Sequence, residues 1–183
     1  MTPAQYLEFR KSESNQEIKD IFNFNAKAFA DSPDLNWSEE NIKKEIKEGW
    51  KLYSVNYDED IVAALFLKMD EGTLLTKNTP IKLIYQGNGF SHKIKDFYEQ
   101  VAKENNLKKI INYCPSDNFR MISLNEGHDY KKTGKTHGPD NDILEWEKKL
   151  ENWYRLIHLL GGKNGQEKSN KKESYEKSGK KGY

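Results

Sequence analysis

At 183 residues, the chain is long enough to bury one core and short for two. Its longest apolar run, residues 61–67, falls far short of the roughly 20 residues that cross a bilayer, and the first residues lack the apolar stretch of a secretory signal. The single cysteine, Cys114, cannot form an internal disulfide. We therefore expect a cytoplasmic protein with no membrane partner. The formal net charge of +1 argues against a general nucleic-acid-binding surface.

Positive charge gathers at the C-terminal end. Residues 161–183 hold seven lysines and three glutamates, which gives +4 there and leaves −3 for the remainder. Their glycine, serine, asparagine and lysine content cannot offset the entropy of ordering, so we expect a disordered tail. Such a tail is either a solubilising end or a weak tether for a polyanion, and nucleic acid enters as a partner only in the second case.

Strand and helix signals begin with a short predicted strand at residues 7–11. Ser14 and Glu17 have the spacing of a capping box, and the apolar residues after them recur at helical spacing, which predicts a first helix. A second helix is predicted to begin near Ser38. Residues 52–57 and 61–67 are separated by three acidic residues, an interval of hairpin length, so they should be neighbouring antiparallel strands.

The alternation continues after a turn at residues 70–72. A strand signal at 73–76 resumes at 81–84 after Pro80, and the two stretches count once in the order; Ile94, Phe97, Tyr98 and Val101 then mark one buried face of a helix. The remaining predicted elements are a strand at 109–114, a short helix at 118–125 and two strands at 130–136 and 142–147. The order is β-α-α-β-β-β-α-β-α-β-β, which predicts a mixed sheet with helices in the α/β or α+β class.

Apolar residues continue at helical spacing beyond this order, at Trp146, Leu150, Trp153, Ile157 and Leu160. We expect one domain over residues 1–149, a C-terminal amphipathic helix at 150–160 that follows or replaces the last strand, and the tail at 161–183. The C-terminal helix would pack against the domain or form the contact of a homodimer.

A glycine-rich stretch, Gln86-Gly87-Asn88-Gly89-Phe90-Ser91, lies directly before the third long helix. A helix N-terminus offers unpaired N–H groups and a partial positive charge, and glycine lets an anion approach that backbone closely. The pair of glycines is either a turn that needs positive φ or a cradle for a diphosphate.

Two motifs in the right order resemble those of the GNAT superfamily of acetyl-CoA-dependent N-acyltransferases, over about residues 6–149. The family writes its pyrophosphate loop Q/R-x-x-G-x-G/A, and Gln86, Gly89 and Ser91 fit it with serine at the last place. The family often shows N-x-R-M-I-x-L further on, which residues 118–124 reproduce. Asp129 and Tyr130 stand where the family has Gly-Phe.

The resemblance implies a GNAT-like, mostly antiparallel mixed sheet and acetyl-CoA as acetyl donor. Its pantetheine arm would lie in a V-shaped gap between the strands at 81–84 and 109–114. Backbone groups around Leu83 and Ile84 would hold this arm, and Asn118 would hydrogen-bond it. The diphosphate would bind at Gln86, Gly87, Asn88, Gly89, Phe90 and Ser91.

The catalytic residues depart from the family pattern. The family's usual general acid is a tyrosine seven residues after the helix asparagine, and this chain has Asn125 there, whose amide can hydrogen-bond a thiolate. Tyr113 is a second catalytic candidate, and Asp70, Glu71 and Tyr85 are further substitutes. Three alternatives remain: these residues carry out catalysis, positioning of the cofactor is sufficient for it, or the protein has no catalytic activity.

The resemblance therefore predicts an N-acetyltransferase that acts on a primary amine of a small molecule or a protein. The alternative is a catalytically inactive GNAT-fold binding or structural protein, as in phage particles. The four histidines lack metal-ligand spacing, so no metal is expected. Cys114 should be a small buried residue. Trp37 and Trp50 belong to the core or border the acceptor groove.

Overall fold

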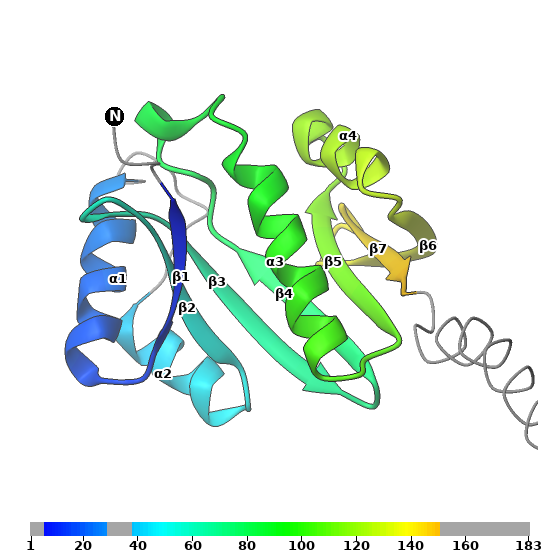
Figure 1. The fold of residues 1–183 in the computed structure, drawn as a ribbon. Helices are drawn as coiled ribbons and strands as arrows, with labels where there is room; N and C mark the ends of the chain where they lie inside the picture. Colours follow the sequence, from blue (N-terminus) through cyan, green and yellow to red (C-terminus); the bar gives the residue numbers. More distant parts are fainter. Residues whose placement is uncertain (1–5, 29–37, 151–183) are drawn as a thin grey trace, which may run out of the picture. The chain divides into compact units, whose positions relative to one another are not determined.

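A seven-stranded sheet with the order β1-β2-β3-β4-β5-β7-β6 runs through the described part of the chain, residues 6–28 and 38–150 of a computed structural model (Figure 1). The strands are β1 (Leu7–Ser12), β2 (Lys51–Tyr57), β3 (Asp60–Asp70), β4 (Thr73–Asn78), β5 (Lys109–Pro115), β6 (Lys131–His137) and β7 (Ile143–Lys149). The helices are α1 (Asn15–Ala28), α2 (Glu39–Lys47), the 3₁₀ helix η1 (Leu83–Tyr85), α3 (Phe90–Glu104) and α4 (Phe119–Gly127). The predicted order and fold class are confirmed.

Local capping explains where the first two helices begin. The Ser14 N–H donates to the Glu17 carboxylate at 2.8 Å while the Glu17 N–H donates to Ser14 Oγ at 3.2 Å, which is the predicted capping box. Ser38 Oγ accepts from the Asn41 N–H at 3.1 Å and caps α2. The predicted hairpin is also confirmed, because β2 and β3 pair antiparallel.

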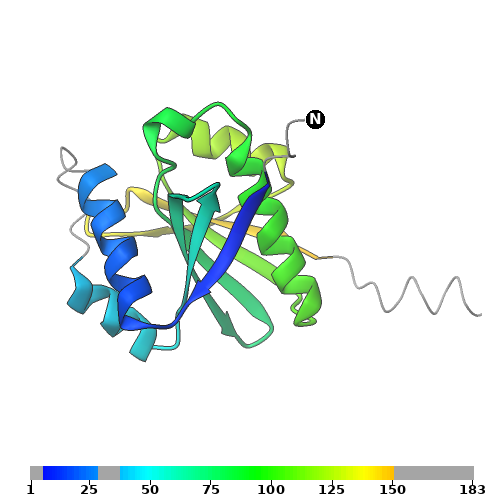
Figure 2. The ribbon, with the colours of Figure 1, turned by 60° about the vertical axis from the view of Figure 1, so that its left-hand side comes forward.

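The helices cover both faces of the sheet. Figure 2 shows α1 and α2 on one side and α3 on the other. The buried residues divide accordingly: Ile21 and Ile42 pack against Phe66 on the α1–α2 face, whereas Leu74, Tyr98 and Trp146 share the cluster on the α3 face. Successive residues of a strand point to opposite faces, so Glu145 lies opposite to Trp146.

The only parallel pair among the described strands is β4 with β5. Their register runs from Thr73 opposite Lys109 to Thr76 opposite Asn112 and then stops, although both strands continue. Beyond this point β5 keeps its full antiparallel pairing with β7, and Thr79 stays with β3 through its N–H to Ala64 O at 2.9 Å. The two strands therefore part after Thr76 and Asn112.

The predicted strand at residues 81–84 is wrong. The chain still contacts β3 after Pro80, where the Lys82 N–H donates to Val62 O at 2.9 Å, but it then bends into η1, where the Leu83 and Ile84 side chains are 77% and 70% exposed. The strand that borders the gap is β4, which ends at Asn78. An apolar run next to a proline gives the same pattern for a short strand and for an exposed turn, which is why the sequence misleads here.

The predicted C-terminal helix and tail lie outside the described residues beyond Leu150, and so does Trp37. Leu150 donates its N–H to Lys108 O at 2.9 Å. Within residues 6–28 and 38–150, no helix has both the length and the apolar character that a membrane span requires.

Candidate functional site

The glycine-rich loop has the backbone that its sequence suggests. Gly87 and Gly89 both have positive φ, 84° and 74°, and Gly89 is the N-cap of α3 without a capping side chain. A Cβ built on either glycine would meet no atom within 4 Å, so the space in front of the loop is open. Within the described residues, the N–H groups of 87–91 donate to no protein atom. They remain available for an anion at a helix N-terminus.

Side chains brace the loop from behind. Gln86 donates from Nε2 to Ile81 O at 3.0 Å and accepts at Oε1 from Arg120 Nη1 at 3.3 Å. Asn88 donates to Tyr85 O at 3.1 Å. Gln86 and Asn88 thus hold the loop by hydrogen bonds to the chain itself, and Gln86 brings the Arg120 guanidinium of α4 to the same place.

A hollow of about 590 Å³ opens in front of this loop, between the first turns of α3 and α4, and we call it the α3–α4 hollow. Its lining reaches from Gly87 and Gly89 to Asn78 at the end of β4, where the strands part. Asn118, the N-cap of α4, also lines it, with Oδ1 accepting from the Met121 N–H at 3.0 Å. The hollow thus connects the free N–H groups of residues 87–91 with the gap in the sheet.

The structure brings together most of the residues predicted to bind the cofactor. The lining of the hollow includes Gln86, Gly87, Gly89, Phe90, Ser91 and Asn118. It does not include Leu83 and Ile84, because these residues lie in η1 and not in the predicted strand. It also does not include Asn88, whose side chain hydrogen-bonds the Tyr85 carbonyl. The backbone that borders the gap in the sheet is the end of β4, and not the segment around Leu83 and Ile84.

Asn125 is fully buried and does not line the hollow. Its Oδ1 accepts a 2.6 Å hydrogen bond from Lys95 Nζ, while its own Nδ2 has no partner among the described residues. Lys95, on α3, is 2% exposed and does line the hollow. Burial lowers the pKa of Lys95 to about 7. Lys95 was not among the predicted site residues, because one lysine between apolar helix positions is also typical of a solvated face.

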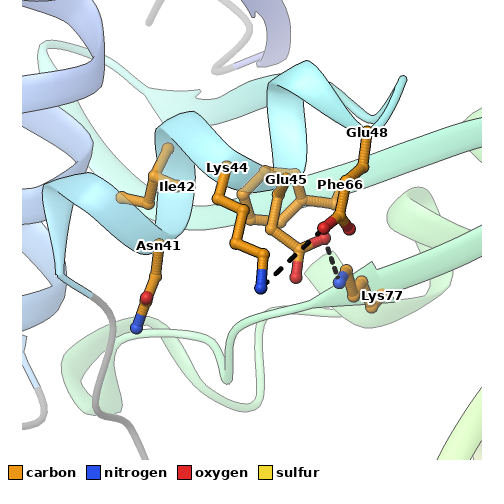
Figure 3. A pocket seen from close by; sticks show the side chains of 7 residues that line it. All are labelled: Asn41, Ile42, Lys44, Glu45, Glu48, Phe66 and Lys77. Carbon is orange, nitrogen blue, oxygen red and sulfur yellow. Dashed lines mark hydrogen bonds and ion pairs between the residues drawn. The ribbon is translucent and has the colours of Figure 1, made fainter.

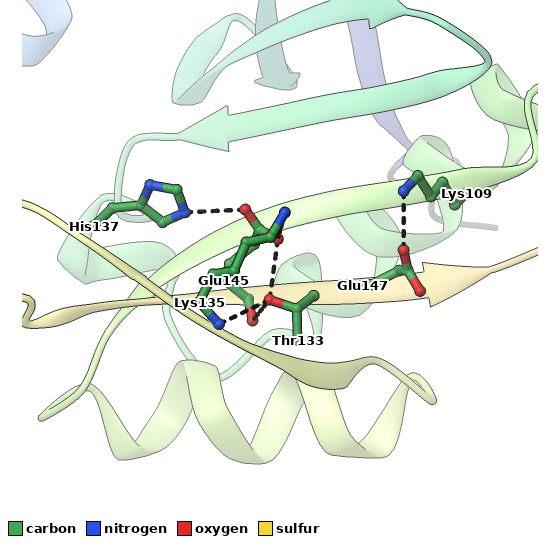
Figure 4. Close-up of polar contacts among 6 residues, drawn as sticks. All are labelled: Lys109, Thr133, Lys135, His137, Glu145 and Glu147. Carbon is green, nitrogen blue, oxygen red and sulfur yellow. Dashed lines mark hydrogen bonds and ion pairs between the residues drawn. The ribbon is translucent and has the colours of Figure 1, made fainter.

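Tyr113 lies on the opposite face of the sheet, where it contacts His137. Figure 4 shows His137 in a polar cluster with Glu145. The Tyr113 ring meets the His137 ring edge-on at 5.0 Å, and His137 Nε2 lies 3.0 Å from Glu145 Oε2. Burial, and then the charge of Glu145, raise the pKa of Tyr113. Glu145 also accepts from Thr133 Oγ1 at 3.0 Å and lies 3.6 Å from Lys135 Nζ. Neither histidine spacing nor the strand pattern identified this cluster.

The other predicted substitutes do not meet at the gap. Asp70 and Glu71 lie at the β3–β4 turn, at the end of β4 that remains paired with β5. The Tyr85 hydroxyl donates to Asp60 Oδ2 at 2.7 Å, and this hydrogen bond raises the pKa of Tyr85. Cys114 is buried, as expected. Among the described residues, no group of three or more His, Cys, Asp or Glu is placed to hold a metal ion.

A second hollow, of about 240 Å³, lies beside α2 on the opposite face, and we call it the α2 hollow (Figure 3). It is lined by Asn41, Ile42, Lys44, Glu45, Glu48, Phe66 and Lys77. Lys77 directly follows the last residue of β4 that pairs with β5, and its ammonium forms an ion pair with Glu45. The same ammonium lies 4.2 Å from the centre of the Trp50 ring. Trp50 therefore contacts a residue that lines this hollow.

Comparison with solved structures identifies the fold. A spermidine N-acetyltransferase from Vibrio cholerae in complex with CoA and spermine matches with a TM-score of 0.65 and 15% identity, over 81% of this chain and 98% of that one. A GNAT family acetyltransferase from Elizabethkingia anophelis with acetyl-CoA bound matches with a TM-score of 0.63 and 15% identity, over 79% and 98%.

A PaiA N-acetyltransferase from Thermoplasma acidophilum in complex with coenzyme A has a TM-score of 0.64 and 15% identity, over 79% of this chain and 99% of its own. No family model and no curated protein sequence matches the chain. The chain therefore has the fold of the GNAT acetyltransferases, as the two motifs predict.

Proposed function

We propose that the protein is an N-acetyltransferase that transfers an acetyl group from acetyl-CoA to a primary amine. The observation that carries this proposal is the row of free N–H groups at residues 87–91, at the head of α3 and in front of open space. A diphosphate fits there, because the amides are aimed by the helix and two glycines remove the side chains that would block it. The CoA complexes of proteins with the same fold add support.

In this account the chain mainly binds and orients. The loop holds the diphosphate, and the Arg120 guanidinium, fixed by Gln86, adds positive charge beside it. Asn118 and the backbone at the end of β4 hold the arm that leads to the thioester. Placing an amine and a thioester together removes much of the entropic barrier to acyl transfer, and backbone donors at the parted strands stabilise the developing oxyanion.

The acceptor amine would approach from the opposite face, where the α2 hollow lies beside the parted end of β4. Glu45 and Glu48 supply carboxylates there, which attract an amine-bearing small molecule or protein segment. In the free protein, the Lys77 ammonium forms an ion pair with Glu45 and contacts the Trp50 ring. A cationic acceptor would compete with Lys77 for these partners.

Calorimetric titration with acetyl-CoA, followed by a thiol-release assay over a panel of amines, tests the proposal. We expect saturable binding and release of free CoA thiol with at least one amine. Absence of binding would contradict the cofactor assignment.

A catalytically inactive GNAT-fold protein is the second candidate. The observation in its favour is that none of the described residues lining the α3–α4 hollow is a carboxylate, together with the complete burial of Asn125. Binding of acetyl-CoA without thiol release for any amine would favour this candidate over the transferase.

A further inference from the structure

Lys95, which lines the α3–α4 hollow, is a buried lysine whose burial does not stabilise the fold. It is 2% exposed, and among the described residues it has no ion-pair partner. Its Nζ hydrogen-bonds Asn125 Oδ1 at 2.6 Å and lies 4.3 Å from the centre of the Tyr130 ring. An amide and an aromatic face offset only part of the cost of burying an ammonium, so an apolar residue would serve the fold better here.

The other titratable side chains that line the hollow have partners elsewhere. Tyr85 donates to Asp60, and Arg120 contacts Gln86 at the loop. His92 Nδ1 lies 2.9 Å from His128 Nε2. Lys95 is thus the one titratable group in this lining that is buried and lacks a titratable hydrogen-bond partner.

The position of Lys95 suits the reacting end of an acyl thioester. Ser91, one helical turn earlier, belongs to the loop, and the Lys95 side chain extends from α3 toward Asn125 of α4. The groups around its Nζ come from every neighbouring element: Tyr98 on α3, Cys114 on β5, Lys148 on β7, and His128 and Tyr130 after α4. None of these is a carboxylate that would neutralise the ammonium.

Two further polar atoms near Lys95 lack partners. Asn125 Nδ2 and the Tyr130 hydroxyl are buried and form no hydrogen bond within the described residues. Buried polar atoms are normally satisfied, so their lack of partners indicates a place where a polar ligand atom or water belongs. Both residues are direct neighbours of the Lys95 ammonium.

We propose that Lys95 is the catalytic acid of the transfer, giving its proton to the sulfur of the leaving CoA thiolate. This inference rests on the proposed function. The acceptor nitrogen bonds to the carbonyl carbon, the carbon–sulfur bond breaks, and sulfur leaves with the electron pair. The proton of the Lys95 ammonium forms the S–H bond, and the neutral lysine regains a proton from solvent, which receives the one lost by the acceptor amine. Asn125 is the positioning residue that holds Nζ in place.

The first test is made on binding and needs no acceptor. CoA is titrated with base when bound to the wild-type protein, to Lys95→Met and to Lys93→Met, and the thiolate is followed by its ultraviolet absorbance. Lys93 is an exposed lysine two residues away on the same helix and is the matched control. We expect the bound thiol to titrate at higher pH in Lys95→Met than in the other two proteins, because an ammonium and a thiolate stabilise each other, so the bound thiolate raises the pKa of Lys95 above its value in the free protein and keeps the lysine protonated.

The second test uses turnover. With any amine that the wild-type protein accepts, Lys95→Met should lose roughly 10²-fold or more in kcat with little change in the KM for acetyl-CoA, while Lys93→Met keeps both. Lys95→Arg should keep the lower thiol titration yet lose turnover, because a guanidinium does not release its proton near neutrality.

Three outcomes would overturn the inference while leaving the proposed function intact. One is the same thiol titration in Lys95→Met and wild type. Another is equal loss of affinity by Lys95→Met for CoA and for CoA lacking its sulfur, which would make Lys95 a phosphate ligand. The third is stable acetylation of Lys95, seen by mass spectrometry, which would make it an acceptor. Failure of the wild-type protein to bind CoA would instead refute the proposed function itself.

Discussion

Lys95 on the α3 face and Glu145 on the opposite face are both buried but have different partners, although the α3 face also holds a paired lysine, Lys148 with Glu99. On the α3 face, Lys95 has an amide and an aromatic ring as partners. On the opposite face, Glu145 is surrounded by His137, Thr133 and Lys135, and Lys77 pairs with Glu45. A buried charge with complementary partners is compatible with a structural role. A buried charge without them lowers the stability of the fold, so its presence indicates a functional role. This difference supports the proposed role of Lys95 in the chemistry on the α3 side.

Blocking the loop should have the largest effect. Gly89→Val introduces a branched side chain where the diphosphate would meet the backbone, and we expect the affinity for CoA to fall at least ~100-fold, about 3 kcal/mol. Isothermal titration calorimetry measures this change. Unchanged affinity would mean that the anion site lies elsewhere.

The positive φ of Gly89 also makes this substitution strained, so a matched control is needed. Gly134 in β6 has φ of 85° and, like Gly89, no atom within 4 Å of a built Cβ. Gly134→Val should therefore show similar backbone strain and keep its affinity for CoA. Equal loss in both variants would attribute the effect to folding.

The buried lysine should appear as a pH dependence of stability. Burial lowers the pKa of Lys95 to about 7 from 10.5, so between these values the unfolded chain binds the proton that the folded chain has lost. The contribution of Lys95 to the free energy of unfolding therefore rises with pH across this window, by up to about 5 kcal/mol. Urea unfolding at a series of pH values should show this rise in wild type and in Lys93→Met, and a flatter profile in Lys95→Met. Parallel profiles for all three would indicate that the lysine is solvated.

The paired cluster should show the same direction of pH dependence in a more acidic window, because the Glu145 charge stabilises the fold whereas the Lys95 charge destabilises it. Burial raises the pKa of Glu145, but hydrogen bonds from His137 and Thr133 and the charge of Lys135 outweigh it, so the pKa lies below its ordinary value. This stability is present above the unfolded pKa and is lost as pH falls through the folded one. Glu145→Gln should destabilise the protein by about 1 kcal/mol near neutral pH and have less effect in acid. The exposed Glu126→Gln serves as control in the same unfolding experiments. A pH-independent effect would assign the loss to packing.

The smallest change is expected in the α2 hollow. Lys77→Met frees Glu45 and leaves Trp50 without its cation. Steady-state kinetics should show a change of about threefold in the KM for the amine, because a partly exposed ion pair contributes little. The affinity for acetyl-CoA should not change. A matching loss of acetyl-CoA affinity would mean that the two hollows do not serve different substrates.

The sequence predicted the elements whose signals are local. The capping box at Ser14 and Glu17, the hairpin of β2 and β3 and the apolar stripe of α3 each depend on residues close in the chain. The loop at residues 86–91 was found for the same reason, since glycines before a helix are visible in the sequence.

What could not be predicted depends on distant residues. The end of β4 is decided by its pairing with β3 and β5, and the apolar run at 81–84 carries no sign of it. The contact between Lys95 and Asn125, which are 30 positions apart, joins two helices, and the contact between His137 and Glu145 joins two strands. Such contacts follow from packing and leave no pattern in one sequence.

The most direct test of the account is a titration of the isotope-labelled protein with CoA, followed by amide NMR. We predict saturable shifts of the Gly87, Gly89 and Ser91 amide signals, with Gly134 unmoved. Saturable binding that leaves the loop amides unchanged, or no binding at all, would contradict the central claim that these amides form the diphosphate site.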